Sequence, residues 1–499
     1  MAKLTRNALA AVGVVALVLA SGFVYYYEAY YLPQQPACDP VAPGSISRTQ
    51  VSSVTFGAVT EYKLPSQGRW PNAVTTAPDG SVWFAEEEIP GVGHLYPGNG
   101  TLVEYAWPGY ATPKPPDCLY AASSSGIALW DGRVWVADEY GNAILGVNPG
   151  DGSTVRINTT VGGAVYPYWL AAGPDGNLWY TSDNTPGSLG RIFPNLTLSV
   201  VRLDGIGTDE PIQLTFVNSS LAFVAAINEA ENETTKTCIC SGHIYSFDPA
   251  NVSSAITPRV VGGDYLLQLP TSVAYSDGRV WVAQHGPSSV LSYDYASGQW
   301  TKYPTSTVPW STTLPLVIAA NGSRIWFNEH YANKIAMLDG AQGTLTEISE
   351  SNPPASGPAG IQNDESIALG AGGLWFTSET ANYVGFVSAD YRPGFSVMAA
   401  GNGSVTVQPG GSATLSLRVT GAWSSTLGVN VSDSENYNSI PEKMHFSPSA
   451  STVPPGSSPY ALTVSLTLDQ SIPQGRYVVA VTLTEGGVQQ TAYVFVNVS

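Results

Sequence analysis

The chain repeats one hydrophobic pattern seven times: an apolar run, a polar turn, and then a strand with an aromatic residue at its centre. The clearest copies are residues 77–86 and 173–181, in which Pro-Asp-Gly precedes the strand. An Asp-Gly pair between two apolar runs is a strong signal for a β-hairpin. The aromatic positions are spaced 44 to 58 residues apart and are Trp83, Trp135, Trp179, Phe223, Trp281, Trp326 and Trp375.

Each repeat continues with two more short apolar segments, such as residues 143–147 for a third strand and 343–348 for a fourth. A unit of four short strands cannot bury both of its faces alone, so the units must stack on one another. Four strands per unit, repeated radially, are typical of a β-propeller. The pattern therefore predicts an all-β fold with seven blades, in which the large aromatic side chains fill the space between neighbouring blades.

The ring is expected to close with residues from the start of the chain. Residues 57–65 copy the fourth-strand pattern of residues 100–108, yet they precede the first aromatic repeat. The last repeat runs through residues 382–387 and has no clear fourth strand of its own. We expect residues 57–65 to supply it, which removes an exposed sheet edge and gives a propeller over residues 57–392.

After residue 392 the aromatic repeat stops and the pattern changes to simple alternation. Residues 393–499 contain about seven short alternating segments, punctuated by Pro-Gly pairs at 409–410 and 455–456. Seven short strands in about 100 residues are typical of an immunoglobulin-like β-sandwich. This is the second domain that the sequence predicts.

The start of the chain predicts a membrane segment. Residues 8–27 carry no charge, follow Lys3 and Arg6, and end in a cluster of tyrosines. About twenty helical residues span a bilayer, and the flanking positive charges predict a cytoplasmic N-terminus. We expect residues 1–31 to be a cytoplasmic tip and transmembrane signal-anchor, residues 32–56 a linker, and the bulk of the chain extracytoplasmic. The alternative is a cleaved signal peptide, with a cleavage site after residues 18–20.

Composition supports the extracytoplasmic location and argues against nucleic acid as a partner. The chain has 20 Lys and Arg against 38 Asp and Glu, a net charge of −18, which disfavours nucleic acid. It is expected to be a cell-surface glycoprotein, because ten Asn-x-Ser/Thr sequons fit an exported chain. The sequon asparagines are Asn99, Asn158, Asn195, Asn218, Asn232, Asn251, Asn321, Asn402, Asn430 and Asn497.

The four cysteines are Cys38, Cys118, Cys238 and Cys240, an even number that allows two disulfides in three possible pairings. A bond between Cys38 and Cys118 would tie the linker to the propeller. Cys238 and Cys240 would then pair with each other across a strained two-residue spacing. A metal site at Cys-x-Cys is the alternative, although no second pair of ligands accompanies it.

Candidate chemistry lies just after each aromatic strand, at one end of the predicted ring. Carboxylates or histidines stand there in six repeats, and more acids precede the innermost strands at residues 209–210 and 364–365. Carboxylates and histidines together can hold a divalent metal or act as acid and base; the alternative is that these acids are solvated or cap turns. The candidate catalytic residues are His285, His330, Asp364 and Glu365, and the candidate ligands for Mg²⁺ or Ca²⁺ are Glu329 and Glu379. The same repeat position also holds Glu87, Glu139 and Asp183.

The repeats resemble those of the streptogramin B lyases, also called virginiamycin B lyases, over about residues 57–390. The resemblance is carried by residues 173–181, 325–329 and 373–377. It implies a seven-bladed propeller and a carbon–oxygen lyase that linearises a cyclic depsipeptide by elimination, with a metal held by glutamates and a histidine base. Glu379 matches a metal-binding glutamate of that family. The family's base lies in a Glu-x-His tripeptide, where this chain has Gln-Asn-Asp-Glu at residues 362–365.

Three functions fit this sequence. The first is a membrane-anchored extracytoplasmic propeller that binds a ligand, a glycan or a surface partner, and the missing Glu-x-His favours it. The second is a metal-dependent lyase related to the streptogramin B lyases. The third is a structural subunit of a surface layer or filament.

Overall fold

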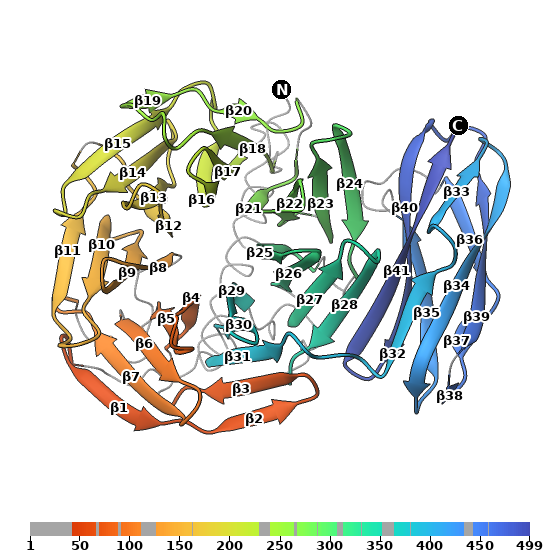
Figure 1. Ribbon diagram of the computed structural model, residues 1–499, viewed down its shortest axis with the longest axis horizontal. Helices are drawn as coiled ribbons and strands as arrows, with labels where there is room; N and C mark the ends of the chain where they lie inside the picture. The colour runs from red at the N-terminus through yellow and green to blue at the C-terminus, as the bar shows by residue number, and fades with distance from the viewer. Residues whose placement is uncertain are drawn as a thin grey trace, which may run out of the picture.

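The computed structural model describes most of the chain from residue 42 to its end. The described residues are 42–65, 69–87, 91–110, 126–161, 163–228, 240–263, 267–286, 288–306, 313–330, 332–351, 364–379, 381–433, 443–457 and 459–499. Within them the fold is all-β, with strands β1 to β41. Seven small sheets stand around a central axis, and a two-sheet unit lies beside the ring (Figure 1).

The first four blades follow the order of the repeats, with the innermost strand first in each. Blade 1 contains β4 (Pro71–Thr76), β5 (Val82–Glu86), β6 (Gly91–Tyr96), β7 (Thr101–Ala106) and β1 (Ile46–Gln50). Blade 2 contains β8 (Ile127–Trp130), β9 (Arg133–Asp138), β10 (Ala143–Val147) and β11 (Thr154–Asn158). Blade 3 contains β12 (Pro167–Ala172), β13 (Leu178–Ser182), β14 (Ser188–Ile192), β15 (Leu198–Leu203) and β19 (Ala255–Ile256). Blade 4 contains β16 (Glu210–Asn218), β17 (Leu221–Asn228), β18 (Ser241–Phe247) and β20 (Arg259–Val260).

The remaining three blades complete the circle. Blade 5 contains β21 (Pro270–Ser276), β22 (Arg279–Gln284), β23 (Ser289–Asp294) and β24 (Gln299–Pro304). Blade 6 contains β25 (Pro315–Asn321), β26 (Arg324–Glu329), β27 (Lys334–Asp339) and β28 (Thr344–Ser349). Blade 7 contains β29 (Asp364–Gly370), β30 (Gly373–Ser378), β31 (Tyr383–Ser388), β3 (Val59–Lys63) and β2 (Ser53–Phe56).

The hairpin turns explain why Asp-Gly recurs. Asp131 and Gly132 have φ of 48° and 71°, and Asp277 and Gly278 have φ of 51° and 75°. Two successive residues with positive φ form the turn that matches the twist of a two-residue hairpin. Asp tolerates this left-handed conformation, and Gly adopts it without steric cost.

The repeated aromatic residues hold neighbouring blades together. Trp83 lies in one apolar cluster with Val134 and Val136 of blade 2, and Trp135 lies in another with Leu178 and Tyr180 of blade 3. The same arrangement continues around the ring, with Phe223 taking the tryptophan position in blade 4. Trp375 of blade 7 packs with Val82 and Phe84 of blade 1, which closes the circle. All seven side chains are at most 5% exposed.

The ring also closes by strand pairing. Strand β3 pairs antiparallel with β31, with Val59 opposite Val387 and Lys63 opposite Tyr383. The expected linker, 32–56, is wrong for its last eleven residues, because β1 and β2 extend the sheets of blades 1 and 7 by one outer strand each. The alternation of apolar and polar residues in Ile46–Gln50 is what allows β1 to pair with β7.

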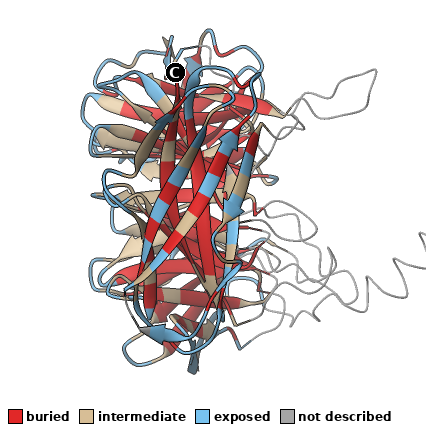
Figure 2. Ribbon diagram, turned by 90° about the vertical axis from the view of Figure 1, so that its right-hand side faces the viewer, coloured by how far each residue is buried: buried red, intermediate tan, exposed pale blue. Residues whose placement is uncertain are grey.

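Residues 395–498 form two packed sheets with a shared apolar core. One sheet contains β32 (Phe395–Ala399), β34 (Ser412–Trp423), β39 (Tyr460–Leu468) and β36 (Met444–Pro448), with β38 (Gly456–Ser457) on β34. The other contains β33 (Ser404–Val407), β41 (Val488–Val498), β40 (Gly475–Glu485), β35 (Leu427–Asp433) and β37 (Thr452–Val453). Buried and exposed residues alternate along the strands of the first of these sheets, such as β39 (Figure 2), as expected where one face of a sheet covers a core.

This sandwich is joined to the propeller by a shared sheet. Strand β41 pairs antiparallel with β28, the outer strand of blade 6, from Thr344 opposite Ala492 to Ile348 opposite Val488. Blade 6 and half of the sandwich thus form one continuous nine-stranded sheet. The outward side chains of Val478, Ala480 and Tyr493 join the apolar cluster of blades 5 and 6.

Two predictions concern parts of the chain outside the described residues. The expected membrane segment falls within residues 1–41, and the described residues include no helix long and apolar enough to cross a membrane. Cys240 is disulfide-bonded, while Cys38, Cys118 and Cys238 lie outside the described residues.

Candidate functional site

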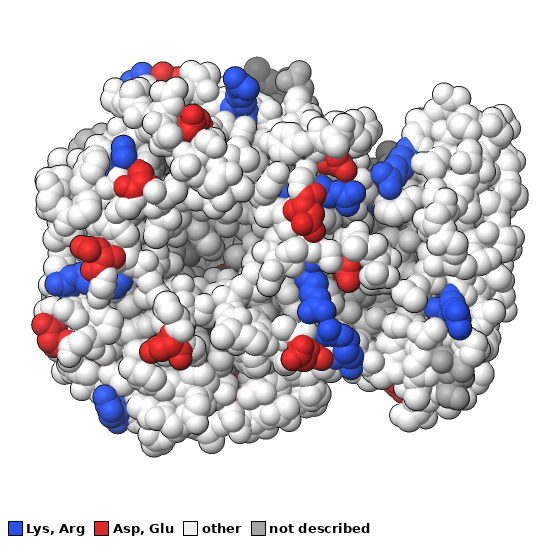
Figure 3. All heavy atoms as spheres, viewed as in Figure 1, with Lys and Arg blue, Asp and Glu red and all other residues white. Residues whose placement is uncertain are grey.

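The alternating strand directions bring the residues that follow each second strand to one end of the central channel. We call this end the mouth and define it by Glu87, Glu139, His285, His330, Glu365 and Glu379. Glu87 comes from blade 1, Glu139 from blade 2, and Glu365 and Glu379 from blade 7. The two histidines, His285 and His330, come from blades 5 and 6. Figure 3 shows the opposite face of the ring, which is hollowed at its centre.

Glu379 links two other glutamates of the mouth. Its carboxyl group hydrogen-bonds with the carboxyl of Glu87 and with that of Glu365. Asn72, on the innermost strand of blade 1, donates from Nδ2 to Glu87 Oε2 at 3.0 Å. Carboxyl groups in contact cannot all be ionised, because like charges oppose each other's ionisation.

Both outer members of this carboxyl chain titrate near neutrality. Burial, together with the negative charge of Glu379 and Glu139, raises the pKa of Glu87 to about 7. Burial also raises the pKa of Glu365 to about 7, with a smaller rise from Glu87 and an opposing effect of its hydrogen bond with Glu379. Groups that titrate near pH 7 in a recess are suited to proton exchange and to reversible binding of cations.

The two histidines extend the carboxyl chain toward blades 5 and 6. His330 Nδ1 lies 3.5 Å from Glu365 Oε1, and the His330 side chain is about 10% exposed. The ring of His285 meets the ring of His330 edge to face, with centroids 5.2 Å apart. Burial, with an added effect of His330, lowers the pKa of His285 to about 3, so this imidazole is neutral at physiological pH.

A small cavity and an exposed tyrosine adjoin this group. A cavity of about 40 Å³ is lined by residues from the innermost strands of six blades, among them Asn72, Trp169, Thr271 and Glu365. Tyr140, the residue after Glu139, is 58% exposed. Its pKa is raised first by the charge of Glu139, and Glu87 and Asp183 contribute to the same field. Asp183 of blade 3 thus faces the same mouth.

The mouth glutamates are expected to lower the unfolding free energy of the protein as pH rises. Glu87 and Glu365 have pKa values of about 7 in the fold against 4.5 for a free glutamate, so between these values the folded state holds protons that the unfolded state has released. Unfolding free energy is therefore expected to fall as pH rises across this window. Urea unfolding at pH 5 and pH 8 should show a smaller difference for the double variant Glu87→Gln/Glu365→Gln than for the native chain. The control Asp390→Asn, which removes an exposed acid, should show the same change in unfolding free energy between pH 5 and pH 8 as the native chain. An equal change in all three proteins would contradict the burial of Glu87 and Glu365 at the mouth.

The structure does not bring the two candidate metal ligands together. Glu329 is fully buried, and burial raises its pKa well above the usual range, with further effects of Glu347 and Lys334. Glu329 thus belongs to a polar cluster between blade 6 and the sandwich, whereas Glu379 lies in the mouth. Adjacent residues at a strand end face opposite sides, so His330 faces the mouth and Glu329 does not.

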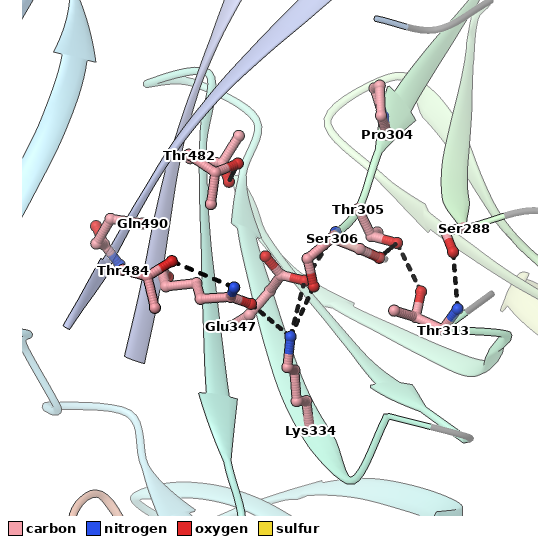
Figure 4. Close-up of polar contacts among 12 residues, drawn as sticks. Ser288, Pro304, Thr305, Ser306, Thr313, Lys334, Glu347, Thr482, Thr484 and Gln490 are labelled. Atoms are coloured by element: carbon pink, nitrogen blue, oxygen red, sulfur yellow. Dashed lines mark hydrogen bonds and ion pairs between the residues drawn. The ribbon is translucent and has the colours of Figure 1, made fainter. Parts of the chain in front are cut away.

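Lys334 is the cation of this second cluster. Its Nζ lies 3.9 Å from Glu347 Oε1 and donates to Ser306 Oγ at 2.6 Å and to Gln489 Oε1 of the sandwich. Figure 4 shows Lys334 directed at Glu347 and Ser306, with Thr484 of the sandwich on the far side of the group. The cluster joins blade 5, blade 6 and the sandwich, and it has a structural role.

Other predicted acids are also structural. Asp209 Oδ2 accepts from Tyr245 OH at 2.8 Å and lies 2.7 Å from His243 Nδ1, which fixes the start of blade 4 against β18. Asp364 begins β29, the strand that carries Glu365. Among the described ranges, no group of three or more His, Cys, Asp and Glu side chains is arranged to hold a metal ion.

Most of the sequons fall in turns. Asn99, Asn158, Asn195, Asn218, Asn251, Asn321 and Asn402 are exposed at the ends of strands or between them. Asn430 lies within β35, and Asn497 Nδ2 donates to Ser404 Oγ at 2.9 Å within the sandwich sheet. Asn232 lies outside the described residues.

The chain matches no protein-family model and no curated protein. Among solved structures it is similar to a streptogramin B lyase, at 17% identity over 66% of this chain and 97% of that one, with a TM-score of 0.47. A catalytically inactive virginiamycin B lyase from Staphylococcus aureus with Quinupristin aligns at 17% identity over 69% and 99%, with a TM-score of 0.46. BamB from Moraxella catarrhalis aligns at 12% identity over 72% and 99%, with a TM-score of 0.36. These are similarities to β-propeller proteins.

Proposed function

We propose that this chain is a membrane-anchored extracytoplasmic β-propeller glycoprotein that binds a positively charged ligand or surface partner at its mouth. The observation that carries the proposal is the chain of carboxyl groups Glu87, Glu379 and Glu365, extended by Glu139 and Asp183. Acids that converge in a recess concentrate negative potential there, which attracts cations. The uncharged run at residues 8–27 and the sequons support the location.

The ligand is expected to carry an amine. The mouth offers carboxylate acceptors beside Tyr140, whose ring is exposed at the rim. An alkylammonium group can donate hydrogen bonds to carboxylates while it lies over an aromatic face. Affinity should rise from pH 6 to pH 8, because Glu87 and Glu365 lose their protons across that range.

Calorimetric titration of the exported part of the chain with spermidine tests this function. We expect binding at pH 8 that is about tenfold weaker at pH 6, and about tenfold weaker again in Glu379→Gln, each factor corresponding to about 1.4 kcal/mol. Asp390→Asn serves as the control because it removes an exposed acid away from the mouth. Equal affinity for Glu379→Gln and the native chain would place the binding site elsewhere.

A metal-dependent lyase is the second candidate, and the pair His330 and Glu365 favours it. A histidine 3.5 Å from a buried carboxyl has the arrangement of a positioned base. The test is incubation with a cyclic depsipeptide and Mg²⁺, followed by mass spectrometry. Elimination gives a linear product of unchanged mass and hydrolysis one heavier by a water molecule. Turnover by the native chain that is lost in His330→Ala would support the lyase.

A further inference from the structure

Blade 4 has a second cavity on its outer side. The cavity has a volume of about 600 Å³, within the range of ligand sites in proteins. Its lining residues are Ser220, Leu221, Ser246, Phe247, Asp248, Asn251, Ser253, Ala255, Ile256, Thr257 and Arg259. None of these residues belongs to the mouth, and we call it the blade-4 cavity.

The cavity exists because the fourth strand of blade 4 is divided between two sheets. Strand β19 leaves the blade and pairs parallel with β15 of blade 3, with Arg202 opposite Ala255. Strand β20 returns and pairs antiparallel with β18, with Ser246 opposite Arg259. The other propeller blades each have a continuous fourth strand. The interruption leaves a recess where a regular blade has a filled edge.

The lining combines hydroxyl, charged and apolar groups. Ser246 Oγ donates to the Arg259 carbonyl at 3.3 Å, and Ser253 Oγ donates to the Ala255 carbonyl at 2.7 Å. Both hydroxyl oxygens keep their capacity to accept hydrogen bonds. Arg259 and Asp248 add a donor and an acceptor, and the Phe247 ring adds an apolar face. This mixture matches a sugar, which has hydroxyls at its edge and C–H groups on its faces.

Asn251, the first residue of a sequon, is itself part of the lining. It is exposed and lies in the turn after β18, where its backbone N–H donates to the Asp248 carbonyl at 3.1 Å. Ser253, which completes the sequon, also lines the cavity. Asn99 and Asn195 occupy the corresponding turns of blades 1 and 3, between the third and fourth strands. Their Oδ1 atoms accept from the N–H groups of Thr101 and Thr197.

We propose that Asn251 carries an N-linked glycan whose first sugars occupy the blade-4 cavity. The attachment joins Asn251 Nδ2 to the anomeric carbon of an oligosaccharide activated on a polyprenyl phosphate or diphosphate. The anomeric carbon–oxygen bond breaks, the phosphate leaves with the electron pair, and the amide loses a proton. The proposal rests on the extracytoplasmic location in the proposed function, but not on ligand binding at the mouth.

Mass spectrometry of the protein purified from its native cells tests the site. Glycopeptides covering Asn99, Asn195 and Asn251 are compared after limited oxidation of the folded protein with periodate, which cleaves vicinal diols. We expect the first sugars on Asn251 to be oxidised about threefold or more slowly than those on Asn99, because the cavity covers them. Denatured protein should show equal rates. Arg259→Ala should speed the oxidation at Asn251 and leave the rate at Asn99 unchanged.

Three results would overturn the proposal, and they separate it from the proposed function. Equal oxidation of the Asn251 and Asn99 glycans in the folded protein would show that the cavity holds no sugar. An unmodified Asn251 beside glycosylated Asn99 or Asn195 would refute the site and leave the extracytoplasmic location intact. No glycan at any sequon would refute the site together with the glycoprotein part of the proposed function.

Discussion

Replacing Arg69 with Met is expected to lower the unfolding free energy of the propeller by about 3–5 kcal/mol. Arg69 is 3% exposed, and its Nε lies 2.9 Å from Glu104 Oε1 while Nη1 lies 3.6 Å from Glu86 Oε2. Met has a similar length but no charge, so both carboxyl groups would be left buried without a cation. Urea unfolding followed by tryptophan fluorescence at pH 8 measures the loss.

The double variant Arg69→Met/Glu104→Gln is the control for charge. It removes the acidic group that lies closest to Arg69, so we expect it to recover about half of the lost stability. Carboxyl groups without a cation have pKa values above those of the unfolded chain. The loss of unfolding free energy in Arg69→Met, relative to the native chain, should therefore grow as pH rises above about 4.5 and shrink toward pH 4. A deficit that is equal at pH 5 and pH 8 would mean that lost packing, not charge, is the cause.

Glu104 is one of three glutamates on the fourth strand of a blade, counted from the central axis. Glu61 accepts from Ser351 N at 3.0 Å and from Ser351 Oγ at 2.7 Å, and Glu347 accepts from Ser306 N at 3.0 Å. Each partner, like Arg69, follows the last strand of the preceding blade. These glutamates therefore join consecutive blades. The sequence repeats Glu in residues 57–65 and 100–108, but the partners lie outside the repeated motif and could not be predicted from it.

The site was predictable in position but not in detail. Counting four residues after each aromatic anchor leads to Glu87, His330 and Glu379, which the structure places at the mouth. Counting three leads to Glu86 and Glu329, which are buried between blades. The two-residue period of a strand separates the two sets, and a sequence pattern alone does not show which parity faces the channel. Contact between Glu379 and Glu365 also depends on the pairing of β29 with β30 and on its register shift between Asp364 and Ser366.

The relation of the sandwich to the propeller was not visible in the sequence. Its alternating strands are evident from residue 404 onward, but the pairing of β41 with β28 joins residues that lie 140 to 148 positions apart in the sequence. Gln490 Nε2 donates to Thr346 Oγ1 at 2.6 Å across this junction. A polar residue such as Gln490 is expected to face solvent when its strand is considered alone. Gln490 is 4% exposed because the edge strand β28 covers it.

Replacing Tyr493 with Ala is expected to destabilise the chain by about 3–5 kcal/mol and to uncouple the sandwich from the propeller. Tyr493 is 2% exposed, its ring lies edge to face with Tyr303 at 5.3 Å, and its OH donates to the Pro304 carbonyl at 2.7 Å. Alanine would leave a cavity in the cluster shared by blade 5, blade 6 and the sandwich. Differential scanning calorimetry should show one unfolding transition for the native chain and two for the variant. The pairing of β28 with β41 would remain, but the side-chain packing between the sandwich and the propeller would be lost, so the two units would unfold separately.

Tyr295→Ala is the matched control for Tyr493→Ala. Tyr295 lies on blade 5, is 46% exposed, and has its ring contacts with Tyr275 and Tyr293 of the propeller. We expect this change to cost less than about 1 kcal/mol and to keep the single transition. A single transition in Tyr493→Ala, shifted no further than in Tyr295→Ala, would show that the backbone pairing of β28 with β41 couples the two units without help from the buried ring. If both variants instead showed two transitions, coupling would be weak throughout. The contrast between these two tyrosines thus separates coupling by the shared sheet from coupling by the apolar cluster beneath it.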